Sequence, residues 1–131
     1  METFSVRTNG HDELIDITAE VKTIVKQKKC DFGICCIYTP HTTAAITINE
    51  NADPDVQRDL IKGLKHFKLE EVPFKHMEGN SPSHVKSSLF GCSEVVIIEN
   101  GSLQLGTWQG IYFCEFDGPR QRKVHVQIIQ G

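Results

Sequence analysis

The spacing of hydrophobic residues divides the chain into short strands and three helices. Alternation and short apolar runs predict strands over 2–8, 11–15, 32–39, 44–49, 94–99, 102–105, 111–116 and 122–130. Asn9-Gly10 and Asn100-Gly101 each separate two of these strands. Both dipeptides favour two-residue hairpin turns, because their residues tolerate positive φ. The segment 32–39 is apolar on both faces, which predicts a central strand that is buried on both sides.

Helix signals lie between the strands. Thr18 is placed to cap a first helix, Asp53-Pro54 opens a second, and Ser81-Pro82 opens a third that Gly91 ends. The second helix has an apolar stripe at helical spacing, formed by Val56, Leu60, Leu64 and Phe67. These elements predict an α+β fold, a single domain over residues 1–131. About three helices pack on an antiparallel-dominated or mixed sheet that curls towards a barrel or sandwich.

Composition narrows the range of partners and compartments. The 131 residues carry a formal net charge of −3 without a long block of like charge, which argues against binding to nucleic acid. No run approaches the roughly 20 apolar residues that span a membrane, and no signal-peptide pattern is visible at the N-terminus. The five cysteines include no C-x-x-C pair. They indicate reduced thiols in a cytoplasmic protein, with a zinc thiolate or a catalytic cysteine as the alternative.

Three of the six histidines follow a strand, lie in a loop or begin a helix, where rigid scaffolds carry reactive groups. They are His41, His76 and His84. Three imidazoles with an open fourth position are the ligand set of a catalytic zinc site, so these residues predict a divalent metal, with zinc favoured. Because none of them forms an H-x-x-x-H pair on one helix, the alternative is that hydrogen-bonded histidines order the loops.

A polar segment precedes the second helix. Asp53 caps the helix and Asn51 makes the turn, whereas Glu50 has no such local explanation. Glu50 and Asp53 are therefore candidate catalytic carboxylates that act as a base or orient a histidine. Asn51 is a candidate ligand-binding residue.

Glu115 shares a strand face with Ile111 and Phe113, so its carboxylate needs a cationic or metal partner. Arg120 and Arg122 follow just beyond the turn. Either Arg122 pairs with Glu115 across strands, or the two arginines receive an anion in their planar donor forks. Trp108, the single tryptophan, lies in a glycine-bounded loop and either fills the core or stacks on a ring.

Five motifs occur in a fixed order along the chain. They are HTTAA at 41–45, NENADP at 49–54, HMEGN with SHVKSS at 76–80 and 83–88, LGTWQG at 105–110, and EFDGPRQR at 115–122. In these motifs the chain resembles the YjbQ-like family, also called the secondary thiamine-phosphate synthase family. The resemblance implies an α+β domain, a homotrimer, and a metal-associated polar site around His41, His76 and His84.

The resemblance also implies an activity, the joining of a pyrimidine diphosphate to a thiazole phosphate to give thiamine phosphate. For that reaction Arg120, Arg122 and Lys86 are expected to receive phosphate groups, and Trp108 to stack on the pyrimidine. Glu50, Asp53 or Glu115 would act as base or metal ligand. The first expectation is thus a transferase-like enzyme acting on small phosphorylated substrates. The alternatives are a metal-dependent hydrolase of another small molecule and a non-catalytic metabolite-binding or scaffold protein.

Overall fold

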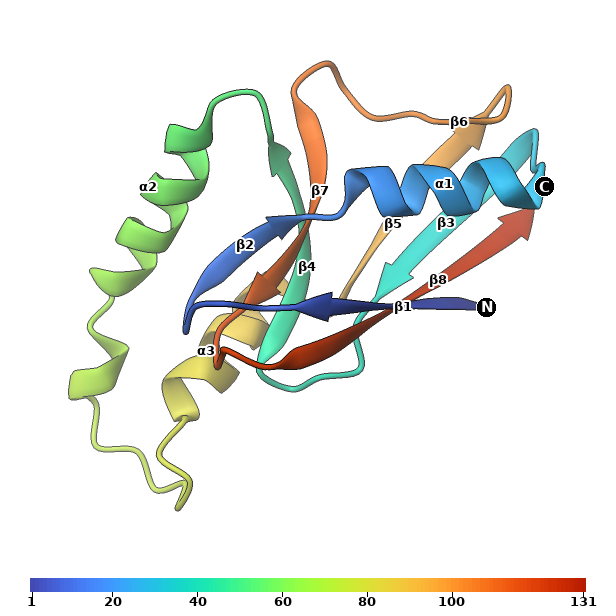
Figure 1. Ribbon diagram of the computed structural model, residues 1–131. Coiled ribbons are helices and arrows are strands. Elements are labelled where there is room, and N and C mark those ends of the chain that lie inside the picture. Colours follow the sequence, from blue (N-terminus) through green and yellow to red (C-terminus); the bar gives the residue numbers. More distant parts are fainter.

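Two antiparallel sheets form the framework of the protein, described over residues 1–131 by a computed structural model (Figure 1). Sheet A has the strand order β1-β8-β3-β5-β6, and sheet B has the order β2-β7-β4. The strands of sheet A are β1 (Glu2–Arg7), β8 (Gln121–Gln130), β3 (Phe32–Tyr38), β5 (Ser93–Glu99) and β6 (Ser102–Leu103). Those of sheet B are β2 (Glu13–Asp16), β7 (Gln109–Glu115) and β4 (Ala44–Glu50). The helices are α1 (Thr18–Lys28), α2 (Pro54–Lys65) and α3 (Ser81–Phe90), with a 3-10 turn, η1 (Leu69–Glu71), after α2.

The larger hydrophobic core lies between the two sheets and beneath α1. It is formed by residues such as Val21 and Val25 of α1, Ile37 of β3, Ile46 of β4 and Phe113 of β7. A smaller core covers the opposite face of sheet B, where Leu64 of α2 joins residues of β4 and β7. Sheet B is therefore buried on both faces, and the expected α+β fold with three helices and a curled sheet is confirmed.

Two of the three predicted helix starts follow the sequence signals. The Asp53 carboxylate accepts a hydrogen bond from the Asp55 amide at 2.9 Å, and Pro54 occupies the first turn of α2. α3 begins at Ser81 with Pro82 in its first turn. The capping role expected for Thr18 is wrong, because Thr18 is already helical. Its backbone and hydroxyl both donate to the carboxylate of Asp16.

One of the two hairpin predictions is wrong. Asn100 and Gly101 have φ values of 52° and 76° and join the paired strands β5 and β6, as expected for a two-residue turn. Asn9-Gly10 does not close a hairpin, because β1 pairs with β8 in sheet A while β2 pairs with β7 in sheet B. The dipeptide lies instead where the chain crosses from one sheet to the other.

The prediction that β3 is buried on both sides is only half right. β3 is central, between β8 and β5, and Cys35 and Ile37 are fully buried against the core. The opposite face is uncovered within this chain: Phe32, Ile34 and Tyr38 are exposed. The sequence of one strand shows that both of its faces are apolar. It does not show whether each face is buried by the same chain or by another molecule.

The apolar stripe predicted for the second helix is also less buried than expected. Only Leu64 is buried, Val56 and Leu60 are partly exposed, and Phe67 lies beyond the end of α2 with 59% of its surface exposed. α2 therefore rests on sheet B along a narrow contact and leaves open surface on either side.

All five cysteines are free thiols; Cys30, Cys35 and Cys114 are buried, whereas Cys36 is partly exposed and Cys92 is exposed. Burial raises the pKa of Cys35 to about 11 and also raises that of Cys114, which keeps both thiols protonated and unreactive at neutral pH. No helix of the structure has the length and apolar character needed to cross a bilayer.

A fully buried ion pair connects the two sheets. Glu115 ends β7 in sheet B, and Arg122 lies near the start of β8 in sheet A. Nε of Arg122 donates to one carboxylate oxygen of Glu115 at 2.8 Å, and Nη2 donates to the other. The Thr8 hydroxyl also donates to Glu115 at 2.8 Å, and the Thr43 hydroxyl accepts from Arg122 at 2.8 Å. These neighbours satisfy the charges that burial removes from water.

Arg122→Met should lower the free energy of unfolding by about 3–5 kcal/mol, because it leaves the Glu115 carboxylate buried without a cation. Urea unfolding followed by circular dichroism measures the change. The double variant Glu115→Leu/Arg122→Met should recover much of the loss, since no isolated charge remains. A single-variant loss below about 1 kcal/mol, the range of a surface ion pair, would contradict this role.

Candidate functional site

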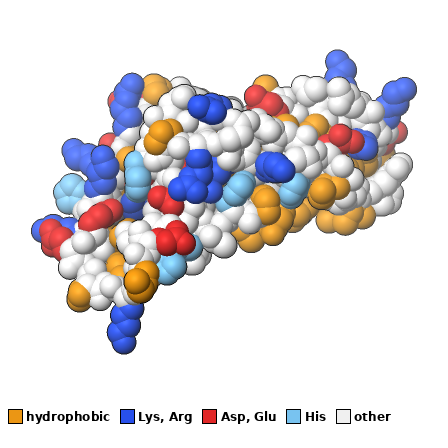
Figure 2. Space-filling model, turned by 60° about the horizontal axis from the view of Figure 1, so that its bottom comes forward, with side chains coloured by type: hydrophobic (Ala, Val, Ile, Leu, Met, Phe, Trp, Pro, Cys, Tyr) orange, Lys and Arg blue, Asp and Glu red, His pale blue; other side chains and the backbone are white.

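A polar cleft of about 420 Å³ opens at one end of the two sheets. It is lined by the loop between β3 and β4, the segment before α3, the first turn of α3 and the turn between β7 and β8. None of its lining residues is hydrophobic; they are Pro40, His41, Thr42, Thr43, His76, Glu78, Asn80, His84, Asp117, Arg120 and Arg122. Figure 2 shows histidine, basic and acidic side chains close together on this side of the molecule.

His41 is held by the backbone of β8. The Lys123 amide donates to Nε2 of His41 at 3.0 Å, so this nitrogen carries a lone pair and the neutral ring carries its proton on Nδ1. Partial burial lowers the pKa of His41, and the positive charges of Arg122 and Arg120 lower it further. His41 is therefore a neutral imidazole at physiological pH, with Nδ1–H as its one N–H donor.

His76 and His84 line the same cleft. Their rings meet edge to face, with centroids 5.4 Å apart and planes 85° apart. His84 is fixed by the first turn of α3, whereas His76 belongs to the exposed segment that precedes the helix. The two rings form a contact pair rather than a convergent set of ligands.

The turn between β7 and β8 supplies the exposed cation of the cleft. Nη2 of Arg120 lies 3.2 Å from the Asp117 carboxylate, and Nε of Arg120 donates to the Asp117 carbonyl at 2.8 Å. Asp117 also accepts from the side-chain amide of Asn80 at 2.9 Å. About half of the Arg120 side chain is exposed, so it can still donate to a ligand in the cleft.

The buried Glu115–Arg122 pair forms the floor beneath these groups. Burial raises the pKa of Glu115, but hydrogen bonds from Arg122, Thr8 and the Asp117 amide outweigh that effect and hold the pKa below its ordinary 4.5. The stabilisation by the ionised pair is therefore present above pH 4.5 and is lost as the pH falls through the lower pKa of the folded state. Arg122 is occupied by Glu115 and Thr43, which leaves Arg120 as the exposed arginine of the pair predicted to bind anions.

Four predicted site residues lie far from the cleft. They are Glu50, Asn51, Asp53 and Trp108. In the β4–β7 ladder, Ala44 pairs with Glu115 beside the cleft, whereas Glu50 pairs with Gln109 at the other end. The two pairs are six residue positions apart along the strand, roughly 20 Å. Trp108 is 62% exposed and neither fills the core nor lines the cleft, and Asp53 is used as the cap of α2.

Lys86, expected to receive a phosphate group, is buried in an ion pair instead. Its Nζ lies 2.6 Å from the Asp12 carboxylate, and only 3% of the side chain is exposed. The other oxygen of Asp12 lies 2.6 Å from Nδ1 of His11. Lys86 thus ties α3 to the crossover between β1 and β2 and has no free surface at the cleft.

The sequence reasoning missed several lining residues as site residues. Thr43 contacts Arg122, Asp117 pairs with Arg120, and Asn80 donates to Asp117. Each belongs to a motif that already contained a predicted residue. These residues could have been predicted, because they are polar and lie close in sequence to His41, His76 or Arg120.

The expected three-histidine metal site is not formed. No three of the histidine, cysteine, aspartate and glutamate side chains are arranged so that they could hold one metal ion. His41 illustrates the reason: its Nε2 lone pair accepts from the Lys123 amide, and its other ring nitrogen carries the proton. The three histidines line one cleft, as the sequence predicts. His41 cannot join the other two in binding a metal, because its Nε2 is already hydrogen-bonded to the backbone of β8.

The pKa of His41 provides a test of this geometry. The Hε1 resonance, followed by NMR against pH, should titrate below the ordinary 6.5 in the folded protein. Arg120→Gln should move the midpoint upwards, because it removes one of the repelling charges, whereas Arg7→Gln should not. Because the folded-state pKa is lowered, His41 stabilises the fold above pH 6.5, and this contribution is lost as the pH falls through the folded pKa. A midpoint at or above 6.5 would refute this description.

Known proteins are similar to this chain in sequence or in fold over nearly their whole length. The UPF0047 protein MJ1081 of Methanocaldococcus jannaschii is 52% identical over 126 residues, covering 96% of this chain and 91% of the relative. A crystal structure from Clostridium acetobutylicum has a TM-score of 0.96 at 53% identity, covering 98% of this chain and all of the other. A structure from Sulfolobus solfataricus has a TM-score of 0.94 at 34% identity, covering 99% and 96% of the two chains.

These relatives do not support the activity expected from the resemblance. The Clostridium protein is described as an uncharacterized conserved protein, and the Sulfolobus protein as one of unknown function. The assignment as a thiamine-phosphate synthase, or as another enzyme with a histidine-bound metal, is therefore wrong, since neither the relatives nor the geometry of the histidines supports it. Residues 2–131 match the family described as UPF0047 protein YjbQ-like, and the chain belongs to this family.

Proposed function

We propose that the polar cleft binds a small, highly polar organic anion. The observation that carries the proposal is the lining itself, which combines an exposed arginine and a neutral histidine donor with no hydrophobic residue. Most small-molecule pockets are largely apolar, so a lining of this kind favours a ligand rich in hydrogen-bonding groups. The cleft volume, about 420 Å³, suits a small metabolite.

The donors have distinct roles in this proposal. The planar guanidinium of Arg120 offers a fork of N–H groups to a phosphate ester or a carboxylate. Nδ1–H of His41 adds a neutral donor whose direction is fixed by the Lys123 contact. Glu78 and the hydroxyls of Thr42 and Thr43 line the same space and would pair with hydroxyl groups of the ligand. The ligand is therefore an anion that also carries hydroxyl groups.

Binding can be tested with probes of matched size. Glycerol 3-phosphate and malate should raise the Tm of the protein, and glycerol alone should not, because only the anions engage Arg120. Calorimetric titration of Arg120→Gln should show affinity for the anions reduced about tenfold, the effect of losing one charge-assisted hydrogen bond.

Arg7→Gln is the matched control, since Arg7 is exposed on β1 outside the cleft. It should leave both affinities unchanged. Equal Tm shifts with glycerol and the anions, or no effect of Arg120→Gln, would exclude this binding mode.

We also propose that the chain forms a homotrimer through the uncovered face of sheet A. The outward residues of three adjacent strands are apolar: Ile34 of β3 pairs with Ile97 of β5 on one side and with Ile129 of β8 on the other. All three are exposed within the chain, and Ile97 is 62% exposed. Figure 2 shows hydrophobic side chains gathered along the lower edge of the half that holds sheet A in Figure 1. A continuous apolar patch of this kind is typical of a surface covered by another subunit.

Ile97→Lys should dissociate the assembly without unfolding the chain, because it places a charge in the contact but removes little from the core. Light scattering after size exclusion should give three times the 14.7 kDa chain mass for the wild type and a single chain mass for the variant. Thr23→Lys, at an exposed position of α1, adds the same charge elsewhere and should keep the assembled mass. A monomeric wild type at micromolar concentration would refute the proposal.

A further inference from the structure

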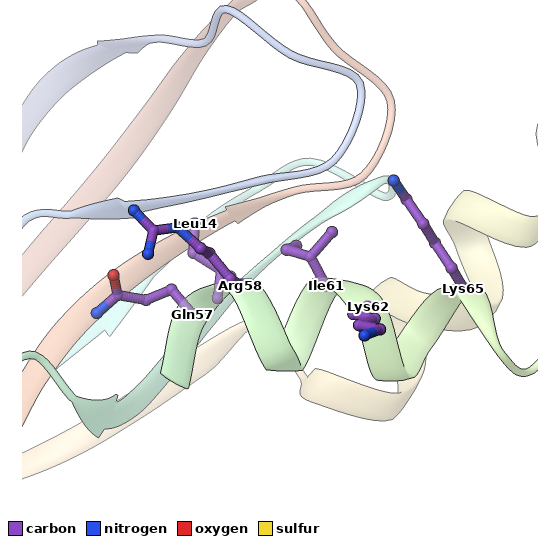
Figure 3. A pocket seen from close by; sticks show the side chains of 6 residues that line it. All are labelled: Leu14, Gln57, Arg58, Ile61, Lys62 and Lys65. Carbon is purple, nitrogen blue, oxygen red and sulfur yellow. The ribbon is translucent and has the colours of Figure 1, made fainter. Parts of the chain in front are cut away.

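A second cavity, separate from the cleft, runs between α2 and the edge strand β2. Its volume is about 360 Å³, and its lining is Leu14 of β2 with Gln57, Arg58, Ile61, Lys62 and Lys65 of α2. Figure 3 shows Arg58, Ile61 and Lys65 extending from α2 on the side where Leu14 lies. We call this cavity the α2 groove; it shares no residue with the polar cleft.

The charged residues of the α2 groove are all basic. Arg58, Lys62 and Lys65 line it and no acidic residue does, although the chain as a whole carries a net charge of −3. One nitrogen of Arg58 pairs with Asp55 at 2.6 Å, and neither Lys62 nor Lys65 takes part in an ion pair. Seven residues separate Arg58 from Lys65, roughly 10 Å along the helix axis, so cations stand at both ends of the groove.

An apolar surface lies between these cations. Leu14 packs against the smaller core, and Ile61, one turn from both Arg58 and Lys65, is only partly buried. Gln57 fixes the N-terminal half of the helix above this surface, because its side-chain amide donates to the Tyr112 hydroxyl and to the Glu50 carbonyl. The α2 groove is thus a built feature of the helix–sheet contact, with an apolar floor and a cationic rim.

We propose that the α2 groove binds a soluble amphipathic monoanion, a carboxylate carried on a short hydrocarbon chain. The floor would bury part of the hydrocarbon, and Arg58 or Lys65 would receive the carboxylate. The volume of about 360 Å³ suits one small molecule, and only a single side chain of β2 contributes to the lining, which favours a free ligand over an extended peptide or a membrane surface. This site shares no residue with the polar cleft and does not depend on the anion proposed to bind there.

Titration calorimetry with decanoate, at low salt and below its micelle concentration, tests the proposal on the full chain. Decanoate should saturate one site, whereas 1-decanol and acetate should bind far more weakly, because each lacks one of the two recognised parts. Arg58→Gln/Lys65→Gln should weaken decanoate about tenfold or more. Lys68→Gln/Lys75→Gln makes the same charge change outside the groove and should have no effect.

Amide shift changes in ¹H–¹⁵N spectra locate the bound decanoate. They should fall on α2 and β2, and Ile61→Asn, with its fold confirmed by thermal melting, should remove them. Equal binding of decanol, an unaffected Arg58→Gln/Lys65→Gln variant, or shifts confined to the outer face of sheet A would overturn the proposal. Cosedimentation with phosphatidylglycerol vesicles that depends on Arg58 and Lys65, without decanoate binding, would replace the soluble ligand by a membrane surface.

Discussion

The buried pair of Glu115 and Arg122 is the constraint on which the rest of the molecule depends. It joins the end of β7 in sheet B to the start of β8 in sheet A. Two charges removed from water are tolerated only when each finds several partners, and here Thr8 and Thr43 complete the set. The pair therefore fixes four chain segments at once, and two of them, the β3–β4 loop and the β7–β8 turn, line the polar cleft.

The chemistry of the cleft follows from that arrangement. Arg122 is occupied by Glu115, so it acts on the cleft mainly through its positive charge. That charge lowers the pKa of His41 and helps to keep the imidazole neutral. Arg120, two residues earlier, lies outside the pair and keeps an exposed guanidinium. One arginine is thus structural and the other is available to a ligand, although they are almost adjacent in the chain. The same division separates Lys86, buried against Asp12, from the lysines that rim the α2 groove.

Both proposed contacts with other molecules arise where one chain leaves apolar surface uncovered. The outer face of sheet A is broad and carries Ile34, Ile97 and Ile129 side by side, which suits another protein surface. The α2 groove is small and bordered by cations, which suits a small anion with an apolar body. In each case the extent of the open surface and the charges around it determine the kind of partner.

The sequence by itself determined the elements, because hydrophobic period, capping and turn residues act over a few neighbouring positions: Asp53 at α2 and Asn100-Gly101 between β5 and β6 are examples. It also pointed to His41, His76, His84 and Arg120 as candidate site residues, all of which line the polar cleft. Only the tertiary structure decided that β1 and β2 belong to different sheets, that Glu50 and Trp108 lie at the far end of β4 and β7, and that His41 is held by the Lys123 amide. These outcomes depend on pairing between residues distant in the chain, which no local pattern encodes.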